Sequence, residues 1–76
     1  MKNNQSAEDY LEAILIVQEK KGNVRSIDVV NELNVSKPSV SVAMKKLRSK
    51  ELITFDDNGY ISFTSEGRSI AENIYN

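Results

Sequence analysis

The 76-residue chain contains no cysteine and no histidine. Without cysteine it can form no disulfide, no CxxC redox centre and no thiolate zinc site. Without histidine it cannot supply, on its own, a Ser-His-Asp or Cys-His catalytic group or an imidazole metal ligand. Its three glycines, Gly22, Gly59 and Gly67, are isolated, which excludes a glycine-rich phosphate loop. These absences argue against an enzyme and leave a carboxylate-based metalloenzyme as a remote alternative.

Long apolar segments are missing as well. No run approaches the ~20 apolar residues that a membrane helix requires, and the N-terminal stretch MKNNQSAEDY lacks the hydrophobic core of a signal peptide. We therefore expect a cytoplasmic protein without membrane contact. A hydrophobic content of 39% and a charged content of 28% are typical of one small globular domain over residues 1–76. Nothing in the sequence indicates a pocket for a small-molecule substrate.

The charges are unevenly distributed. The net charge is −1, yet the stretch NVSKPSVSVAMKKLRSK (34–50) holds five of the ten basic residues and no acid, so the remainder sums to −6 from five bases and eleven acids. A basic patch on an acidic body is the footprint expected of a nucleic-acid-binding surface. The same pattern suits an ordinary solvated helix face, and charge alone favours that second reading.

Helix caps and hydrophobic periodicity predict four helices. Ser6 followed by Asp9 matches a capping box, and Gly22 supplies a stop. Ser26 is the expected cap of the second helix, and Ser36 that of the third. The expected ranges are 7–21, 27–33, 37–50 and 65–75, with Pro38 in the first turn of the third helix, where proline is tolerated. The side chains expected to face inward are Tyr10, Leu11, Ile14, Leu15, Val17, Val29, Val30, Leu33, Val40, Ala43, Met44, Leu47, Ile70, Ala71 and Ile74.

Between the third and fourth helices, residues 52–63 read as a β-hairpin. Two strands, 52–55 and 60–63, flank the sequence DDNG, in which Asn-Gly is a strong hairpin signal. The short segment Asn34-Val35-Ser36 allows only a tight turn between the second and third helices, with Asn34 tolerant of a left-handed conformation. The predicted fold is therefore mainly α with a small β-hairpin, a winged helix-turn-helix.

The outward face of helix 37–50 is suited to DNA. Pro38, Val42, Lys45 and Ser49 lie at its centre, and its margins carry Ser39, Ser41 and Lys46. Small residues at the helix start permit close approach, hydroxyl groups can bind phosphates, and Pro or Val can contact thymine methyl groups. Lysines further along would bind phosphates.

Three segments resemble a known family: EDYLEAI (8–14), NVSKPSVS (34–41) and TSEGRSIA (64–71). Over residues 7–75 the chain resembles the N-terminal domain of the metal-dependent repressors, the diphtheria-toxin-repressor and manganese-regulator family. The resemblance places Ser36, Pro38 and Ser39 where such repressors contact bases and backbone, and it places Val42 where a polar base-contacting side chain often lies. With the face described above, the predicted DNA-binding residues are Arg25, Ser36, Lys37, Pro38, Ser39, Ser41, Val42, Lys45 and Lys46.

The resemblance also implies metal chemistry. Asp9 and Glu12 fall on two carboxylates that the family uses as metal ligands, while its other ligands, including histidines, and its dimerisation domain belong to later helices. Because two carboxylates bind Mn²⁺ or Fe²⁺ poorly, we expect this chain alone to bind no metal, and Mn²⁺ or Fe²⁺ to bind only if a C-terminal part exists. In the alternative reading, Asp9 closes a helix cap and Glu12 is solvated.

The sequence thus predicts the DNA-binding domain of a bacterial transcriptional regulator, a repressor, with double-stranded DNA as its partner. Asp56 and Asp57 at the wing tip would repel phosphates, so we expect the wing to add little affinity. A weak dimer or a monomer is expected, with Ile70, Ile74 and Tyr75 in any two-fold interface. The alternative is a winged-helix protein-interaction module that does not bind DNA.

Overall fold

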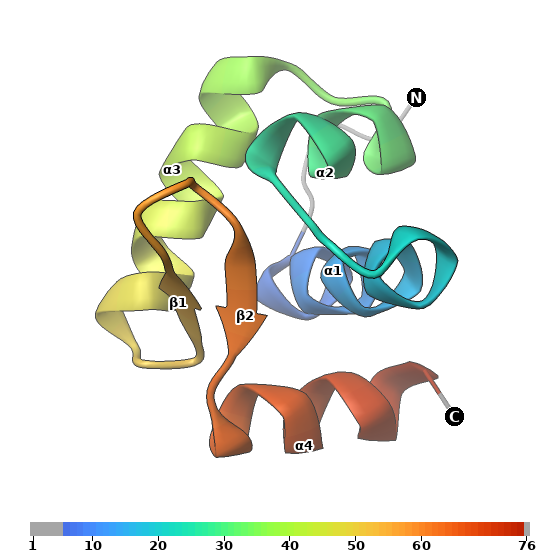
Figure 1. Ribbon diagram of the computed structural model, residues 1–76, viewed down its shortest axis with the longest axis vertical. Helices are drawn as coiled ribbons and strands as arrows, with labels where there is room; N and C mark the ends of the chain where they lie inside the picture. Colours follow the sequence, from blue (N-terminus) through green and yellow to red (C-terminus); the bar gives the residue numbers. More distant parts are fainter. Residues whose placement is uncertain (1–5, 76) are drawn as a thin grey trace.

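Four helices and one antiparallel hairpin occur in residues 6–75, the part of the chain that the computed structural model describes, with only the backbone described at Tyr75. In Figure 1, α1 lies between α2 and α4, α3 runs along one side, and the hairpin lies between α3 and α4. This arrangement confirms the predicted winged helix-turn-helix. The elements are α1 (Ala7–Lys21), α2 (Ser26–Leu33), α3 (Lys37–Ser49), β1 (Ile53–Phe55), β2 (Ile61–Phe63) and α4 (Ser65–Tyr75).

The hydrophobic core is built around α1, which is covered by helices on several sides. The inward positions predicted for the helices are all buried or half-buried, because apolar residues at helical spacing gain most by turning one stripe away from water. Within residues 6–75, none of the helices is long and apolar enough to cross a membrane. The buried hydrophobic residues are Tyr10, Leu11, Ala13, Ile14, Leu15, Val17, Val24, Val29, Val40, Met44, Leu47, Leu52, Ile53, Ile61 and Ala71.

The two ends of α1 follow the sequence signals. The Ser6 hydroxyl accepts a hydrogen bond from the Asp9 N–H at 3.1 Å, and the Asp9 carboxylate accepts one from the Ser6 N–H at 3.2 Å, which completes the capping box. At the other end Gly22 has φ +89°, and its N–H donates to the Gln18 carbonyl. Both ends therefore satisfy backbone groups that have no partner inside the helix.

The start of α2 differs from the prediction. Ser26 is not the cap but the first helical residue, and Arg25 occupies the N-cap position. The Asp28 carboxylate reaches back to accept the Arg25 N–H at 2.9 Å, and the Asp28 N–H donates to the Arg25 carbonyl at 2.9 Å, so the first turn is closed without a serine side chain. Its second oxygen accepts a hydrogen bond from Lys21 Nζ at 2.8 Å. The Lys21 bond, and then the Arg25 N–H, hold the pKa of Asp28 below its ordinary value.

The turn between α2 and α3 is formed as predicted. Asn34 adopts the left-handed conformation, with φ 56° and ψ 49°. Ser36 is the N-cap of α3, and its hydroxyl accepts the Ser39 N–H at 3.2 Å. Pro38 lies in the first turn of α3, where the helix requires no hydrogen bond from its nitrogen.

Helix α3 ends at Ser49, one residue earlier than predicted. Glu51 takes a left-handed conformation with φ 61°. Its N–H donates to the Arg48 carbonyl at 2.9 Å, and the Leu52 N–H donates to the Leu47 carbonyl at 3.0 Å. These two bonds close the helix in a Schellman motif and turn the chain into the hairpin.

The hairpin pairs Ile53 with Phe63 and Phe55 with Ile61, so each strand is one residue shorter at its start than predicted. At its tip the Asp56 side chain accepts hydrogen bonds from the N–H groups of Asn58 and Tyr60, each at 2.9 Å. Gly59 has φ +85° and donates its N–H to the Asp56 carbonyl. Asp56 therefore shapes the turn.

Helix α4 is fixed to the hairpin through Thr64. Its hydroxyl accepts the Gly67 N–H at 3.1 Å and donates to the Glu51 carbonyl at 2.7 Å. Gly67 is buried with its backbone directly against the Leu52 carbonyl. The sequence indicates no role for this glycine beyond its place in the segment TSEGRSIA (64–71).

Candidate nucleic-acid interface

The outer face of α3 is fully accessible. Val40, Met44 and Leu47 face the core with at most 3% of their surface exposed, which fixes the rotation of the helix and turns the opposite side outward. Val42 is 54% exposed, an unusual exposure for a branched apolar side chain. The predicted contact residues at this helix are all exposed: Ser36, Lys37, Pro38, Ser39, Ser41, Val42, Lys45 and Lys46.

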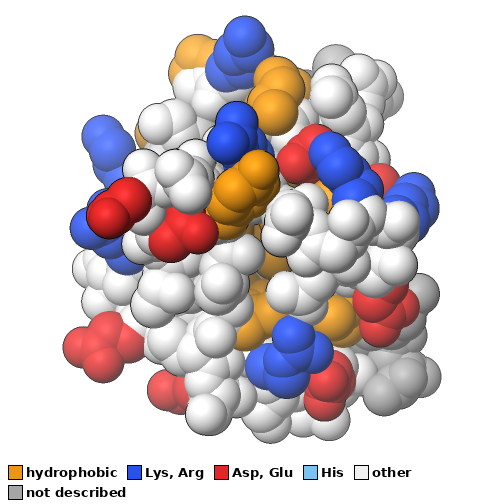
Figure 2. Space-filling model, viewed as in Figure 1, with side chains coloured by type: hydrophobic (Ala, Val, Ile, Leu, Met, Phe, Trp, Pro, Cys, Tyr) orange, Lys and Arg blue, Asp and Glu red, His pale blue; other side chains and the backbone are white. Residues whose placement is uncertain are grey.

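The basic side chains of α3 make no ion pairs with the described part of the chain. Figure 2, in the same view as Figure 1, shows Lys and Arg mostly in the upper half of this face and Asp and Glu in both halves. The α3 lysines therefore keep their charges available to an external anion. The ion pairs of residues 6–75 lie elsewhere and join Lys20 to Glu32, Lys21 to Asp28, and Arg68 to Glu72.

Two serines at the start of α3 have different roles. The Ser36 hydroxyl accepts the Ser39 N–H and donates to the Ser39 hydroxyl at 2.9 Å, so its only hydrogen is used inside the protein. The Ser39 hydroxyl accepts that bond and keeps its own hydrogen to donate. Ser39 is thus the serine of this pair that can donate to an external acceptor.

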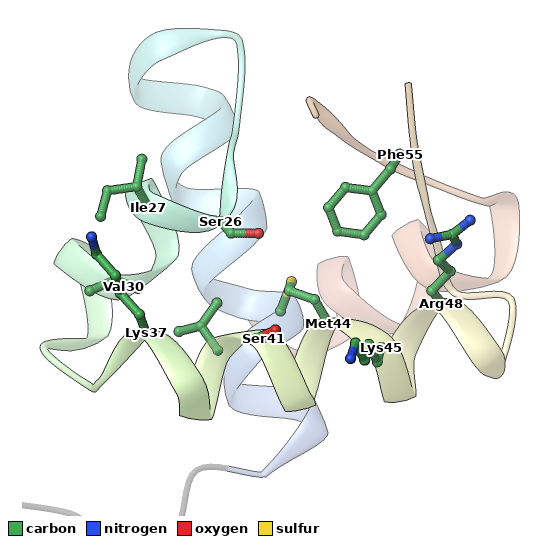
Figure 3. A pocket seen from close by; sticks show the side chains of 10 residues that line it. Ser26, Ile27, Val30, Lys37, Ser41, Met44, Lys45, Arg48 and Phe55 are labelled. Carbon is green, nitrogen blue, oxygen red and sulfur yellow. The ribbon is translucent and has the colours of Figure 1, made fainter. Parts of the chain in front are cut away.

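A groove with a volume of about 510 Å³ separates the start of α2 from the wing, with α3 as its floor. Figure 3 shows Ser41 and Met44 rising from α3 between Ile27 and Phe55 on opposite sides. The centre of the groove is apolar and its edges carry positive charge. It is lined by Ser26, Ile27, Val30, Lys37, Val40, Ser41, Met44, Lys45, Arg48 and Phe55.

Seven of these lining residues were not among the predicted contacts, and three of the seven, Ile27, Arg48 and Phe55, differ in how they could have been found. Arg48 lies 5.9 Å above the Phe55 ring, and Ile27 is 44% exposed. Arg48 could have been found from the sequence, because it follows Lys45 by three residues and therefore shares its helix face. Phe55 and Ile27 meet α3 only through the tertiary fold, and no local signal indicates it.

Arg25 is a predicted contact that does not belong to α3. It is the N-cap residue of α2 and lies beside Tyr60 of the wing. Its guanidinium lies 4.5 Å from the centroid of the Tyr60 ring, and its side chain is exposed. The next residue, Ser26, lines the groove between α2 and the wing.

The family model for the iron-dependent repressor N-terminal DNA-binding domain matches residues 3–63. The chain belongs to this family. Two HTH-type transcriptional regulators named MntR are similar to it: 33% identical over 69 residues in Geobacillus kaustophilus strain HTA426 and 32% identical over 69 residues in Geobacillus thermodenitrificans strain NG80-2. Each match covers 91% of this chain.

Solved structures agree with this membership. The structure of ScaR with bound Zn²⁺ superposes with a TM-score of 0.78 at 28% identity and covers 93% of this chain. The transcriptional regulator Tm0710 from Thermotoga maritima, at 22% identity and a TM-score of 0.69 over 86% of this chain and 49% of its own, shows likeness of fold alone. The chain spans 49% of the length of each MntR relative and 33% of the ScaR chain.

Asp9 and Glu12 are the two carboxylates that the resemblance predicts as metal ligands. One oxygen of Asp9 is engaged in the capping box, and both Asp9 and Glu12 are half-buried. Burial, with the neighbouring Asp9 charge, raises the pKa of Tyr10. In residues 6–75, no three His, Cys, Asp or Glu side chains come together in a group that could hold a metal ion.

The predicted dimer surface is only partly described. Ile70 and Ile74 are half-buried on α4, and the side chain of Tyr75 lies outside the described residues. The weak dimer stays a prediction.

Proposed function

We propose that this iron-dependent repressor-family chain is the DNA-binding domain of a bacterial transcriptional repressor, and that it acts in the cytoplasm on double-stranded DNA. The observation that carries the proposal is the acid-free outer face of α3, which stands exposed while Val40, Met44 and Leu47 fix its inner face. An exposed helix with small residues at its start and lysines further along fits the width of the major groove.

In this proposal each part of the surface has its own task. Lys45 and Lys46 bind phosphates and supply affinity independent of sequence, whereas the start of α3, with Ser39 and Pro38, approaches the base edges. Lys37 and Ser41 line the protein's own groove between α2 and the wing. In the proposed complex, one strand of the duplex would pass along this side of α3.

The direct test is a fluorescence-anisotropy titration of the chain with a labelled duplex over a salt series. We expect binding at low salt that weakens steadily as salt rises, because each neutralised phosphate releases counterions. If the chain binds no duplex even at low salt, the proposal fails, and the fold would then serve as a protein-interaction module.

Val42 is expected to read thymine. Its side chain is 54% exposed at the centre of the outer face, and an apolar side chain there can contact the thymine methyl group. On a duplex selected from a random library, replacing the contacted thymine with uracil should weaken binding about fourfold, the effect of one buried methyl group. The Val42→Ala variant should lose most of this discrimination, and equal discrimination in both proteins would contradict the assignment.

The acidic wing tip calls for separate tests of its two aspartates. Asp57→Lys should leave DNA affinity unchanged if the tip lies away from the phosphates. Asp56→Ala should lower the melting temperature by about 4–8 °C, because two backbone N–H groups lose their acceptor. Thermal melts measure the stability of each single variant, and anisotropy titrations measure its DNA affinity. A clear gain in affinity from Asp57→Lys would show that the tip approaches the phosphates.

We further propose that Mn²⁺ or Fe²⁺ engages Asp9 and Glu12 only together with ligands outside residues 6–75, because such ions take more donors than two carboxylates provide. Binding of duplex DNA by the chain alone then requires no metal. Adding EDTA to the titration should leave the affinity unchanged.

A further inference from the structure

The backbones of Arg25 and Tyr60 are held beside each other by the fold. The Ile61 N–H donates to the Val24 carbonyl at 2.7 Å, which ties the segment before α2 to the start of β2. Figure 1 shows this segment passing beside β2 on its way from α1 to α2. The Arg25 N–H is held in turn by Asp28. The arginine and the aromatic ring are therefore brought together by main-chain contacts that do not involve either side chain.

The Arg25 guanidinium lies over the Tyr60 ring and forms no ion pair within the described part of the chain. The distance from the guanidinium to the centroid of the ring is 4.5 Å. Both Asp28 oxygens are already engaged, one by Lys21 and one by the Arg25 backbone. A guanidinium that lies over a ring and has no carboxylate beside it keeps N–H donors available for an external acceptor.

Arg68 provides an internal contrast. Its guanidinium also lies over a ring of the hairpin, 5.3 Å from the centroid of Phe63. Its donors, however, bind Gln18 at 2.7 Å and Glu72 at 3.2 Å. Arg68 thus joins α4 to α1, whereas the Arg25 guanidinium also lies over a ring but has no hydrogen-bond or ion-pair partner within residues 6–75.

We propose that Tyr60 is a positioning residue for DNA binding, and that the wing contributes by holding Arg25 against a phosphate and not through its acidic tip. The inference rests on the proposed function. In helix-turn-helix proteins the first helix of the motif crosses the DNA backbone, and Arg25 is the N-cap residue of that helix, next to Ser26, which lines the groove. The ring restricts the arginine to few conformations, so less freedom is lost when it binds.

The test compares four variants in anisotropy titrations with a labelled mixed-sequence duplex. Tyr60→Leu removes the ring and should weaken binding about two- to fivefold, the range for an exposed cation–π contact. Arg25→Lys keeps the charge and should weaken it similarly, while Tyr60→Phe keeps the ring and should bind as the parent does. The double variant, Arg25→Lys with Tyr60→Leu, should be no weaker than either single variant, because both changes remove one interaction.

A salt series separates positioning from charge. The slope of log K against log salt should stay unchanged in Tyr60→Leu and fall by about one in Arg25→Ala, which loses a phosphate contact. Arg68→Lys serves as the matched control and should leave affinity unchanged, and thermal melts confirm that each variant is folded.

Parent-like affinity in Tyr60→Leu, or losses that multiply in the double variant, would overturn the role of Tyr60 while leaving the proposed DNA binding intact. Absence of duplex binding by the parent chain would overturn both.

Discussion

Gly67→Ala is expected to lower the free energy of unfolding by about 3 kcal/mol, at the upper end of the range for overpacked sites. A Cβ at this position would overlap the Leu52 carbonyl oxygen and come within 2.8 Å of the carbonyl carbon. These are backbone atoms, so no flexible side chain can move aside. Relief requires α4 to move away from the hairpin, which would disturb the Thr64 bonds to Gly67 and Glu51.

Thermal denaturation measures this effect, and for a domain of this size about 3 kcal/mol corresponds to a fall of roughly 12–24 °C in melting temperature. Gly59→Ala is the matched control. Its Cβ would meet nothing within 4 Å, so only the strain of φ +85° opposes the change, about 1–2 kcal/mol. Because alanine is favoured over glycine within helices by about 1 kcal/mol, a stabilised Gly67→Ala variant would show that α4 does not approach Leu52 this closely.

The double variant Lys45→Ala/Lys46→Ala should bind every duplex about 50-fold more weakly at ~0.1 M salt, with the slope of log K against log salt reduced by about two. Both lysines are exposed on α3, and no acid of the described chain pairs with either. Their charges would therefore be fully available to phosphates. Because phosphates carry no base identity, the loss should be uniform across sequences.

Lys20→Ala/Lys21→Ala removes the same net charge from the end of α1. There the lysines already pair with Glu32 and Asp28, so the loss of DNA affinity should be much smaller. Anisotropy titrations on matched and mismatched duplexes compare the two double variants. Equal losses would mean that only the overall charge of the chain matters and that α3 has no special position on the DNA.

Most of α3 could be predicted because its signals are local. Ser36 caps the helix, Pro38 fits the first turn, and the spacing of Val40, Met44 and Leu47 sets which side faces the core. These features depend on residues within about one or two helical turns of each other, a distance over which sequence spacing fixes spatial neighbours. The start of α2 was mispredicted for a related reason: both Ser26 and Asp28 can satisfy a free helix N–H, and the sequence does not reveal which geometry prevails.

By itself the sequence determined the order of the elements, the inward and outward faces of the helices, and the absence of acid from residues 34–50. Only the tertiary structure decided that Gly67 must be small, that Phe55 and Ile27 enclose a groove over α3, and that Arg25 lies over the Tyr60 ring. Each of these features joins residues at least 10 positions apart in sequence. Such pairs meet only when packing brings separate elements together. The spacing of residues along the sequence does not indicate which of them will be in contact.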